Sequence, residues 1–217
     1  INSDQEAINT REGESGIITM EFDVAENQTL KSITSFQEMD RFLRDDLDST
    51  DANLFGQNNY TEESESWSQE LTYNFSGDRL DVLAGAMYFE EELYGQVLVP
   101  LTNICALLAP ELCGTPVGDF LSTGRYEQNG DVDIEAYGIY AEASYQLTEA
   151  LKIIAGVCYN YEERSGTGAF VFDAAGLDVP TNQSEDWSDV TPRLTVEFEP
   201  NDNMLLYATY NQAFKSG

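Results

Sequence analysis

The sequence is dominated by a hairpin pattern that recurs four times, in which two alternating apolar and polar runs flank a tight turn. Successive side chains of a strand point to opposite faces, so each run predicts a strand with one apolar face. Long acidic stretches follow the hairpins. The tight turns are Glu26-Asn27-Gln28-Thr29, Ser76-Gly77-Asp78-Arg79, Leu147-Thr148-Glu149-Ala150 and Pro200-Asn201-Asp202-Asn203. Short connections on one side and long ones on the other are typical of an all-β, up-and-down antiparallel transmembrane barrel.

The alternation predicts eight strands that are longer than those of globular proteins. At about 9 to 15 residues they exceed the usual five or six and suit the roughly ten residues with which a tilted strand crosses a bilayer. They are expected at 17–25, 30–44, 65–75, 79–91, 132–147, 151–163, 187–199 and 204–214, with Pro192 suggesting a bulge in the seventh. Several apolar faces end in aromatic residues, namely Tyr159 and Tyr161 at the long-loop end and Tyr73, Phe75, Tyr145 and Phe198 at the tight-turn end. Such girdles indicate two membrane interfaces.

The charge of the chain limits its partners. Its 217 residues include 40 acidic and 10 basic ones, for a net charge of −30. This charge excludes nonspecific nucleic-acid binding, because phosphates require Lys and Arg. With 41% hydrophobic residues the chain is too apolar for a disordered polyelectrolyte. We therefore expect the carboxylates in loops and in a wet interior, although an acidic secreted protein would share this composition.

Neither end of the sequence carries a targeting or closing element. The polar start Ile1-Asn2-Ser3-Asp4 is no signal peptide, and Phe214-Lys215-Ser216-Gly217 has no closing turn. No apolar stretch approaches the roughly 20 residues that a transmembrane helix requires. We expect the chain to be a piece of a longer protein.

The three cysteines predict one disulfide. Cys105 and Cys113 lie within one expected loop, and such a pair closes a small ring in an oxidising compartment. A metal pair is the less favoured alternative, because no His or further thiol is near to complete the site. Cys158 lies in a strand pattern, where a small buried residue is expected.

No catalytic constellation or cofactor site stands out. The chain has no His, which removes Ser-His triads and metal-His sites. A carboxylate cluster in the first long loop could ligate Ca²⁺, but a solvated acidic loop is favoured because the Gly of an EF-hand loop is missing. The cluster consists of Asp45, Asp46, Asp48 and Asp51.

Several segments taken together resemble the barrel of TonB-dependent receptors. They include Trp187-Ser188-Asp189-Val190-Thr191-Pro192-Arg193-Leu194, Pro200-Asn201-Asp202 and Leu205-Leu206-Tyr207-Ala208-Thr209-Tyr210. The ending Ala213-Phe214-Lys215-Ser216-Gly217 is similar to the Gly-Phe-Lys-Ser-Gly segment of that family, with Ala213 in place of the first Gly. Each segment is weak alone, and together they are specific.

The resemblance implies an outer-membrane receptor of a Gram-negative bacterium. The family has a barrel of about 22 strands, closed by an N-terminal plug and energised by an inner-membrane TonB complex. It carries scarce small-molecule ligands such as iron-siderophores, cobalamin or oligosaccharides. No plug and no TonB-contacting segment is visible in residues 1–217, so the resemblance implies a partial barrel domain of about eight strands.

Function is expected on two surfaces of such a barrel. The long loops at 45–64, 92–131 and 164–186, with a short helix within 101–112 capped by Thr102 or Asn103, would meet the ligand first. The candidate contacts in these loops are Tyr60, Tyr94, Arg125, Tyr126 and Phe170, for which ordinary loop packing is the alternative. The candidate lumen-facing residues, which would touch the plug or a passing solute, are Glu142, Gln146, Lys152, Asp189, Arg193 and Glu197. Polar pairing between strands is their alternative.

Two other architectures remain open. A soluble, secreted β-sandwich that binds carbohydrate or a protein would also alternate, although rarely over such long runs. A passive outer-membrane channel would share the barrel but lack the plug. The ligand itself cannot be inferred, because one scaffold carries many different loops.

Overall fold

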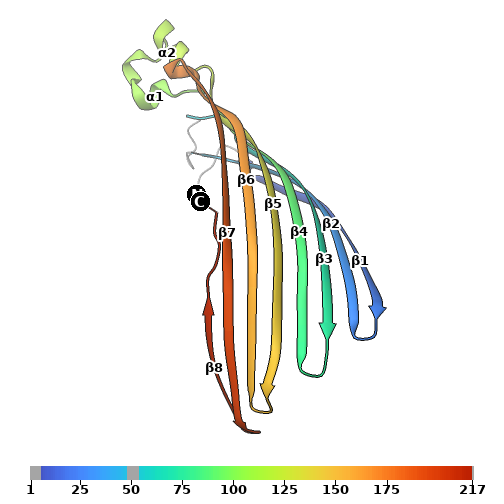
Figure 1. The fold of residues 1–217 in the computed structure, drawn as a ribbon. Helices are drawn as coiled ribbons and strands as arrows, with labels where there is room; N and C mark the ends of the chain where they lie inside the picture. The colour runs from blue at the N-terminus through green and yellow to red at the C-terminus, as the bar shows by residue number, and fades with distance from the viewer. Residues whose placement is uncertain (1–5, 48–53, 217) are drawn as a thin grey trace.

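The computed structural model describes residues 6–47 and 54–216, and these form one antiparallel sheet of eight strands. Every strand pairs with the next in sequence, so the order is β1-β2-β3-β4-β5-β6-β7-β8 (Figure 1). The strands are β1 (Ile8–Ala25), β2 (Gln28–Asp45), β3 (Asn58–Ser76), β4 (Leu80–Pro100), β5 (Arg125–Thr148), β6 (Leu151–Phe172), β7 (Leu177–Asn201) and β8 (Met204–Asn211). The sheet is strongly curved and does not close on itself (Figure 1).

The predicted tight turns join the strands as hairpins. Asn27, between β1 and β2, has a φ of 59°, a conformation that Asn tolerates better than most residues. In the next turn, Gly77 N–H donates to the carbonyl of Leu80 at 2.9 Å. The hairpins fix the register of the four strand pairs that they join. This register settles the facing of 30–44, 79–91 and 204–214, which the sequence pattern left open.

The three long loops are much shorter than predicted, because the strands continue far beyond the apolar segments. The connections run over 46–57, 101–124 and 173–176. Alternation of polar and apolar side chains stops where both faces of a sheet meet water, whereas the backbone ladder does not depend on it. The sequence pattern therefore marked the part of each strand that has one apolar face and missed the rest.

The predicted helix in 101–112 is divided. It forms α1 (Cys105–Leu108) and the 3-10 turn η1 (Pro110–Leu112), followed by α2 (Pro116–Leu121). Ala109 has left the α region, with φ −153° and ψ 72°, because Pro110 disfavours helical backbone in the residue before it. The predicted caps Thr102 and Asn103 are wrong. Ile104 precedes α1 without a side-chain cap, and Thr115 caps α2 by accepting from Gly118 N–H at 3.2 Å.

Pro192 does not create the expected bulge. The β6–β7 register runs through Val157↔Pro192 without a shift. On the other side of β7, the ladder to β8 ends with the pair Arg193↔Asn211. Since Pro192 has no N–H to donate, it takes part on this side as an acceptor, and its carbonyl accepts from Gln212 N–H at 3.1 Å.

The described residues form a single layer, which rules out the β-sandwich alternative because no second sheet packs on the first. In the described part of the chain, the buried hydrophobic residues gather at the end of β4 and the start of the helical segment that follows it. They are Val99, Leu101, Ile104 and Cys105. Among the described residues, no helix has the length and apolarity to cross a membrane.

Candidate ligand-facing surface

The register assigns each strand residue to one of two faces, since residues paired across an antiparallel ladder point the same way. We call the face that carries Glu70, Tyr140 and Glu142 the inner face. The outer face carries Ile139 and Val157, and these apolar side chains are 60% and 47% exposed. In β5 this alternation separates exposed residues from half-buried ones over most of the strand.

A row of aromatic rings crosses the outer face of β3 to β6. Trp67 lies 5.7 Å from Tyr88 between ring centroids, and Tyr137 stacks on Tyr161 at 4.8 Å. Tyr137 also lies 6.3 Å from Tyr159. Amphipathic rings in such a row are typical of a membrane interface, and this row lies on the side of the apolar outer face toward the long connections.

Carboxylates continue on the outer face beyond this row, on strands rather than in loops. They border a hollow of about 240 Å³ whose walls include Glu38, Asp40, Glu63, Glu65, Glu92, Asp131 and Asp133. These carboxylates therefore lie neither in loops nor in the interior, the two places where the charge of the chain led us to expect them. Among the described residues no group of acidic side chains is arranged to hold a metal ion. Asp48 and Asp51 of the possible Ca²⁺ cluster lie outside the described residues.

The six residues predicted to face the lumen share the inner face. The register connects them through the rows Gln146↔Lys152↔Glu197, Glu142↔Gly156↔Arg193 and Asn160↔Asp189. Some of them pair with one another: Lys152 Nζ lies 3.6 Å from Glu197 Oε2, and Arg193 Nη1 lies 3.3 Å from Glu142 Oε2. The inner face thus carries polar and charged groups at the same level where the outer face is apolar.

The ring of Tyr140 lies across Gly85 on the inner face. Tyr140 stands directly opposite Gly85, and its hydroxyl donates to Glu70 Oε1 at 2.7 Å on the next strand but one. An added Cβ at Gly85 would lie 2.6 Å from the Tyr140 ring and 2.9 Å from the Leu71 carbonyl oxygen. Gly85 therefore leaves the space in which the ring lies.

The predicted loop contacts all lie on strands, and the structure divides them between the two faces. Tyr126 and Phe170 come together on the inner face, where their rings meet edge to face at 5.5 Å between centroids. Phe172 extends this cluster, 6.4 Å from Tyr126. The cluster lies where β5 and β6 meet the helical segment, at the far end of the inner face from the tight turns.

Tyr94 and Arg125 lie on the outer face instead. Arg125 Nε pairs with Glu127 Oε2 at 2.6 Å, and Gln96 and Asn129 donate to Glu127 Oε1 at 2.8 Å each. Bonds from Asn129 and Gln96 lower the pKa of Glu127. Burial, together with the nearby Glu127 and Asp131 carboxylates, raises the pKa of Tyr94.

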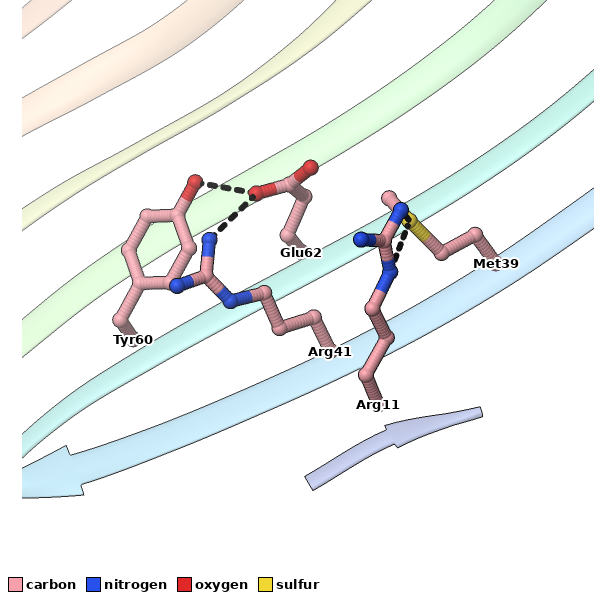
Figure 2. A network of polar contacts seen from close by, with 5 residues as sticks. All are labelled: Arg11, Met39, Arg41, Tyr60 and Glu62. Atoms are coloured by element: carbon pink, nitrogen blue, oxygen red, sulfur yellow. Dashed lines mark hydrogen bonds and ion pairs between the residues drawn. The ribbon is translucent and has the colours of Figure 1, made fainter. Parts of the chain in front are cut away.

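Tyr60 belongs to a polar cluster on the inner face of β1, β2 and β3 (Figure 2). Its hydroxyl donates to Glu62 Oε2 at 2.6 Å, and the Arg41 guanidinium lies 5.4 Å from its ring centroid. The bond to Glu62 raises the pKa of Tyr60. Arg41 Nη1 lies 3.8 Å from the same Glu62 oxygen, and Arg11 lies beside Met39 (Figure 2).

Sequence reasoning missed Arg11 and Arg41 because the first strand was predicted to begin at 17. The tight turn at 26–29 fixes the register of this hairpin, so extending the strand to Ile8 would have placed the two arginines opposite each other. It also missed a hollow of about 680 Å³ bordered by Val132, Arg164, Gln183, Glu185 and Trp187. Most of that hollow lies on extensions of β6 and β7 that the pattern assigned to a loop, whereas Val132 and Trp187 begin predicted strands.

The helical segment between β4 and β5 is closed by a disulfide. Cys105, at the start of α1, is joined to Cys113, between η1 and α2, with the Cα atoms 5.5 Å apart. Leu101 N–H donates to the Gly124 carbonyl at 3.0 Å, which brings the two ends of the segment together. Cys158 is half-buried rather than buried, and its thiol is free.

Comparison with known proteins gives one family. The family model described as TonB dependent receptor-like, beta-barrel matches residues 5–217. The ferric-pyoverdine M114 receptor PbuA of Pseudomonas sp. (strain M114) is 31% identical over 84 residues, which are 39% of this chain and 10% of that protein.

Solved structures share the fold at low identity. The ferric yersiniabactin uptake receptor FyuA from Yersinia pestis matches with a TM-score of 0.74 and 14% identity, over 94% of this chain and 28% of that chain. The siderophore receptor PiuA from Acinetobacter baumannii gives a TM-score of 0.64 and 15% identity, over 94% of this chain and 32% of that chain. This chain thus spans less than a third of either structure.

Proposed function

This chain belongs to the TonB-dependent receptor family, as part of its β-barrel, and on that premise we propose that the protein takes up an iron-siderophore complex by TonB-coupled transport. The family consists of receptors and transporters of the Gram-negative outer membrane. Iron-siderophores are favoured over cobalamin and oligosaccharides because PbuA, FyuA and PiuA are named as siderophore or ferric-chelate receptors.

The observation that carries the proposal is the family match over residues 5–217, together with a sheet whose two faces differ in the way that a lipid-embedded wall requires. Apolar side chains such as Val157 meet lipid in this arrangement. Glu142, Gln146, Lys152, Asp189, Arg193 and Glu197 line the lumen, where they contact the plug or a passing solute.

In this proposal the ligand contacts come from the part of the inner face that lies between the level of the aromatic row and the long connections. Tyr60, Tyr126 and Phe170 lie there, on strand extensions that hold them more rigidly than loops would. Tyr94 and Arg125 are left out of this surface because they lie on the outer face.

The test is uptake of radioactive iron by cells that express the complete receptor under iron limitation. Ferric pyoverdine and ferric yersiniabactin, the chelates in the names of two relatives, serve as first probes, followed by catecholate and hydroxamate complexes. We expect uptake of at least one ferric complex that requires both the receptor and TonB. Uptake that persists without TonB would support the passive channel, and iron uptake that is unchanged without the receptor would reject the proposal.

A further inference from the structure

Two arginines oppose each other on the inner face near the edge of the sheet. The register pairs Arg11 of β1 directly with Arg41 of β2, so both side chains lie on one face (Figure 2). Like charges placed opposite each other destabilise a strand pair. With 40 acidic and only 10 basic residues in the chain, this juxtaposition is not explained by charge balance within the sheet.

Arg11 is left without an anionic partner among the described residues. Its Nε and Nη2 atoms lie 3.1 and 2.8 Å from the thioether sulfur of Met39 (Figure 2). A thioether is a weak, neutral acceptor. None of the ion pairs between described residues includes Arg11, so its charge is available to a ligand that displaces only the sulfur contact.

Arg41 is only partly neutralised. Its one carboxylate partner within residues 6–47 and 54–216, Glu62, is 3.8 Å away and also accepts the much shorter 2.6 Å bond from the Tyr60 hydroxyl. Glu12 and Asp40, the acidic neighbours in sequence, lie on the outer face because side chains alternate along a strand. The inner-face cluster therefore holds two cations against one shared anion, with a tyrosine hydroxyl beside them.

We propose that Arg11 and Arg41 form a guanidinium clamp that binds an anionic oxygen group of the ligand, so that the receptor selects negatively charged ferric chelates. Paired guanidinium groups bind carboxylate or catecholate oxygens through charge-assisted hydrogen bonds. Direct opposition in the register brings both groups within reach of one such anion. The inference rests on the proposed uptake function and adds the charge class of the cargo.

The test measures binding of two ferric complexes to the complete, detergent-solubilised receptor, one an anionic tris-catecholate and the other an uncharged tris-hydroxamate. Arg11→Gln, Arg41→Gln and the double variant are compared with Arg44→Gln. Arg44 is a matched control on the same strand, since it lies on the outer face and its Nε donates to Asn59 Oδ1 at 3.1 Å. Folding of each variant is checked by its heat-dependent mobility in gels, and removal of like-charge opposition should leave it intact.

We expect the wild-type receptor to prefer the anionic complex, and the double variant to lose about tenfold or more in affinity for that complex alone. The uncharged complex should bind all variants equally, and Arg44→Gln should behave as the wild type. Equal losses for both complexes, or no loss in the double variant, would overturn the clamp.

A second measurement separates the clamp from the uptake function. Citrate is titrated into the receptor, and protection of Arg11 and Arg41 from phenylglyoxal is followed by mass spectrometry, with Arg44 as the internal reference. Selective protection in a receptor that imports no ferric complex would keep the anion site and reject iron uptake. Import of ferric complexes without charge preference or protection would keep uptake and reject the clamp.

Discussion

At the scale of single residues, the inner face contains cross-strand pairs in which a large side chain lies over a glycine. Gly85 is the clearest case, because the Tyr140 ring lies across it and reaches Glu70 on β3. This arrangement links three strands through one hydroxyl. The sequence pattern does not predict this contact, because a glycine in an alternating run indicates only a weak strand position.

Gly85→Ala should therefore destabilise the folded barrel by about 1–3 kcal/mol, because the new methyl group meets both a ring and a backbone oxygen. The loss is measured as a lower urea midpoint for the complete receptor in detergent. Gly95→Ala is the matched control on the same strand, since nothing lies within 4 Å of a Cβ added there. Equal midpoints for the two variants would contradict this account of Gly85.

At the scale of strands, the sequence predicted the number of strands, their order and the faces of the clearest ones. Tight turns and apolar alternation are local signals, so β5 and β6 could be recognised within their membrane-spanning parts. Their full lengths could not be predicted, because the backbone hydrogen bonds between the strands continue through polar extensions after the alternation ends. For the same reason Tyr126 and Phe170 were assigned to loops, although their pairing is a property of two extended strands.

The face on which a strand residue lies determines how well the barrel tolerates a charged substitution there. Val157→Arg, on the outer face of β6, should cost about 2–4 kcal/mol if that position lies near the bilayer midplane. Thr191→Arg serves as the control, because Thr191 pairs with the neighbouring Cys158 and lies on the inner face. The measurement is the yield of folded receptor in outer membranes and its denaturant midpoint. A greater loss for Thr191→Arg would reverse the assignment of the two faces.

At the scale of the whole molecule, the dominant feature is an open sheet. β1 pairs only with β2, and β8 only with β7, so each outer edge presents unpaired backbone groups along the described strands. Water can satisfy these groups, whereas hydrocarbon cannot, and each one left unpaired in lipid costs several kcal/mol. The two edges therefore require further strands beside them in the membrane.

The 217-residue segment produced alone should fail to give a heat-stable monomer in detergent or lipid, and should associate through its edges. Light scattering coupled to size-exclusion chromatography measures this association, and the complete receptor is the control. Proline substitutions at Thr19 and Tyr207, within β1 and β8, should reduce the association by removing edge donors. A stable monomer that resists heating would show that the open edges are covered in some other way.

The length of the strands has a consequence for how the cell surface is seen from outside. β5 contains 24 residues, about 80 Å at roughly 3.4 Å per residue, and even at a tilt near 45° this exceeds the ~30 Å of hydrocarbon. Folded backbone thus stands well clear of the bilayer. An antibody or a phage approaching the bacterium would meet rigid, hydrogen-bonded strands rather than flexible loops. Immunisation with the intact receptor should therefore raise antibodies to conformational epitopes that linear peptides cannot imitate.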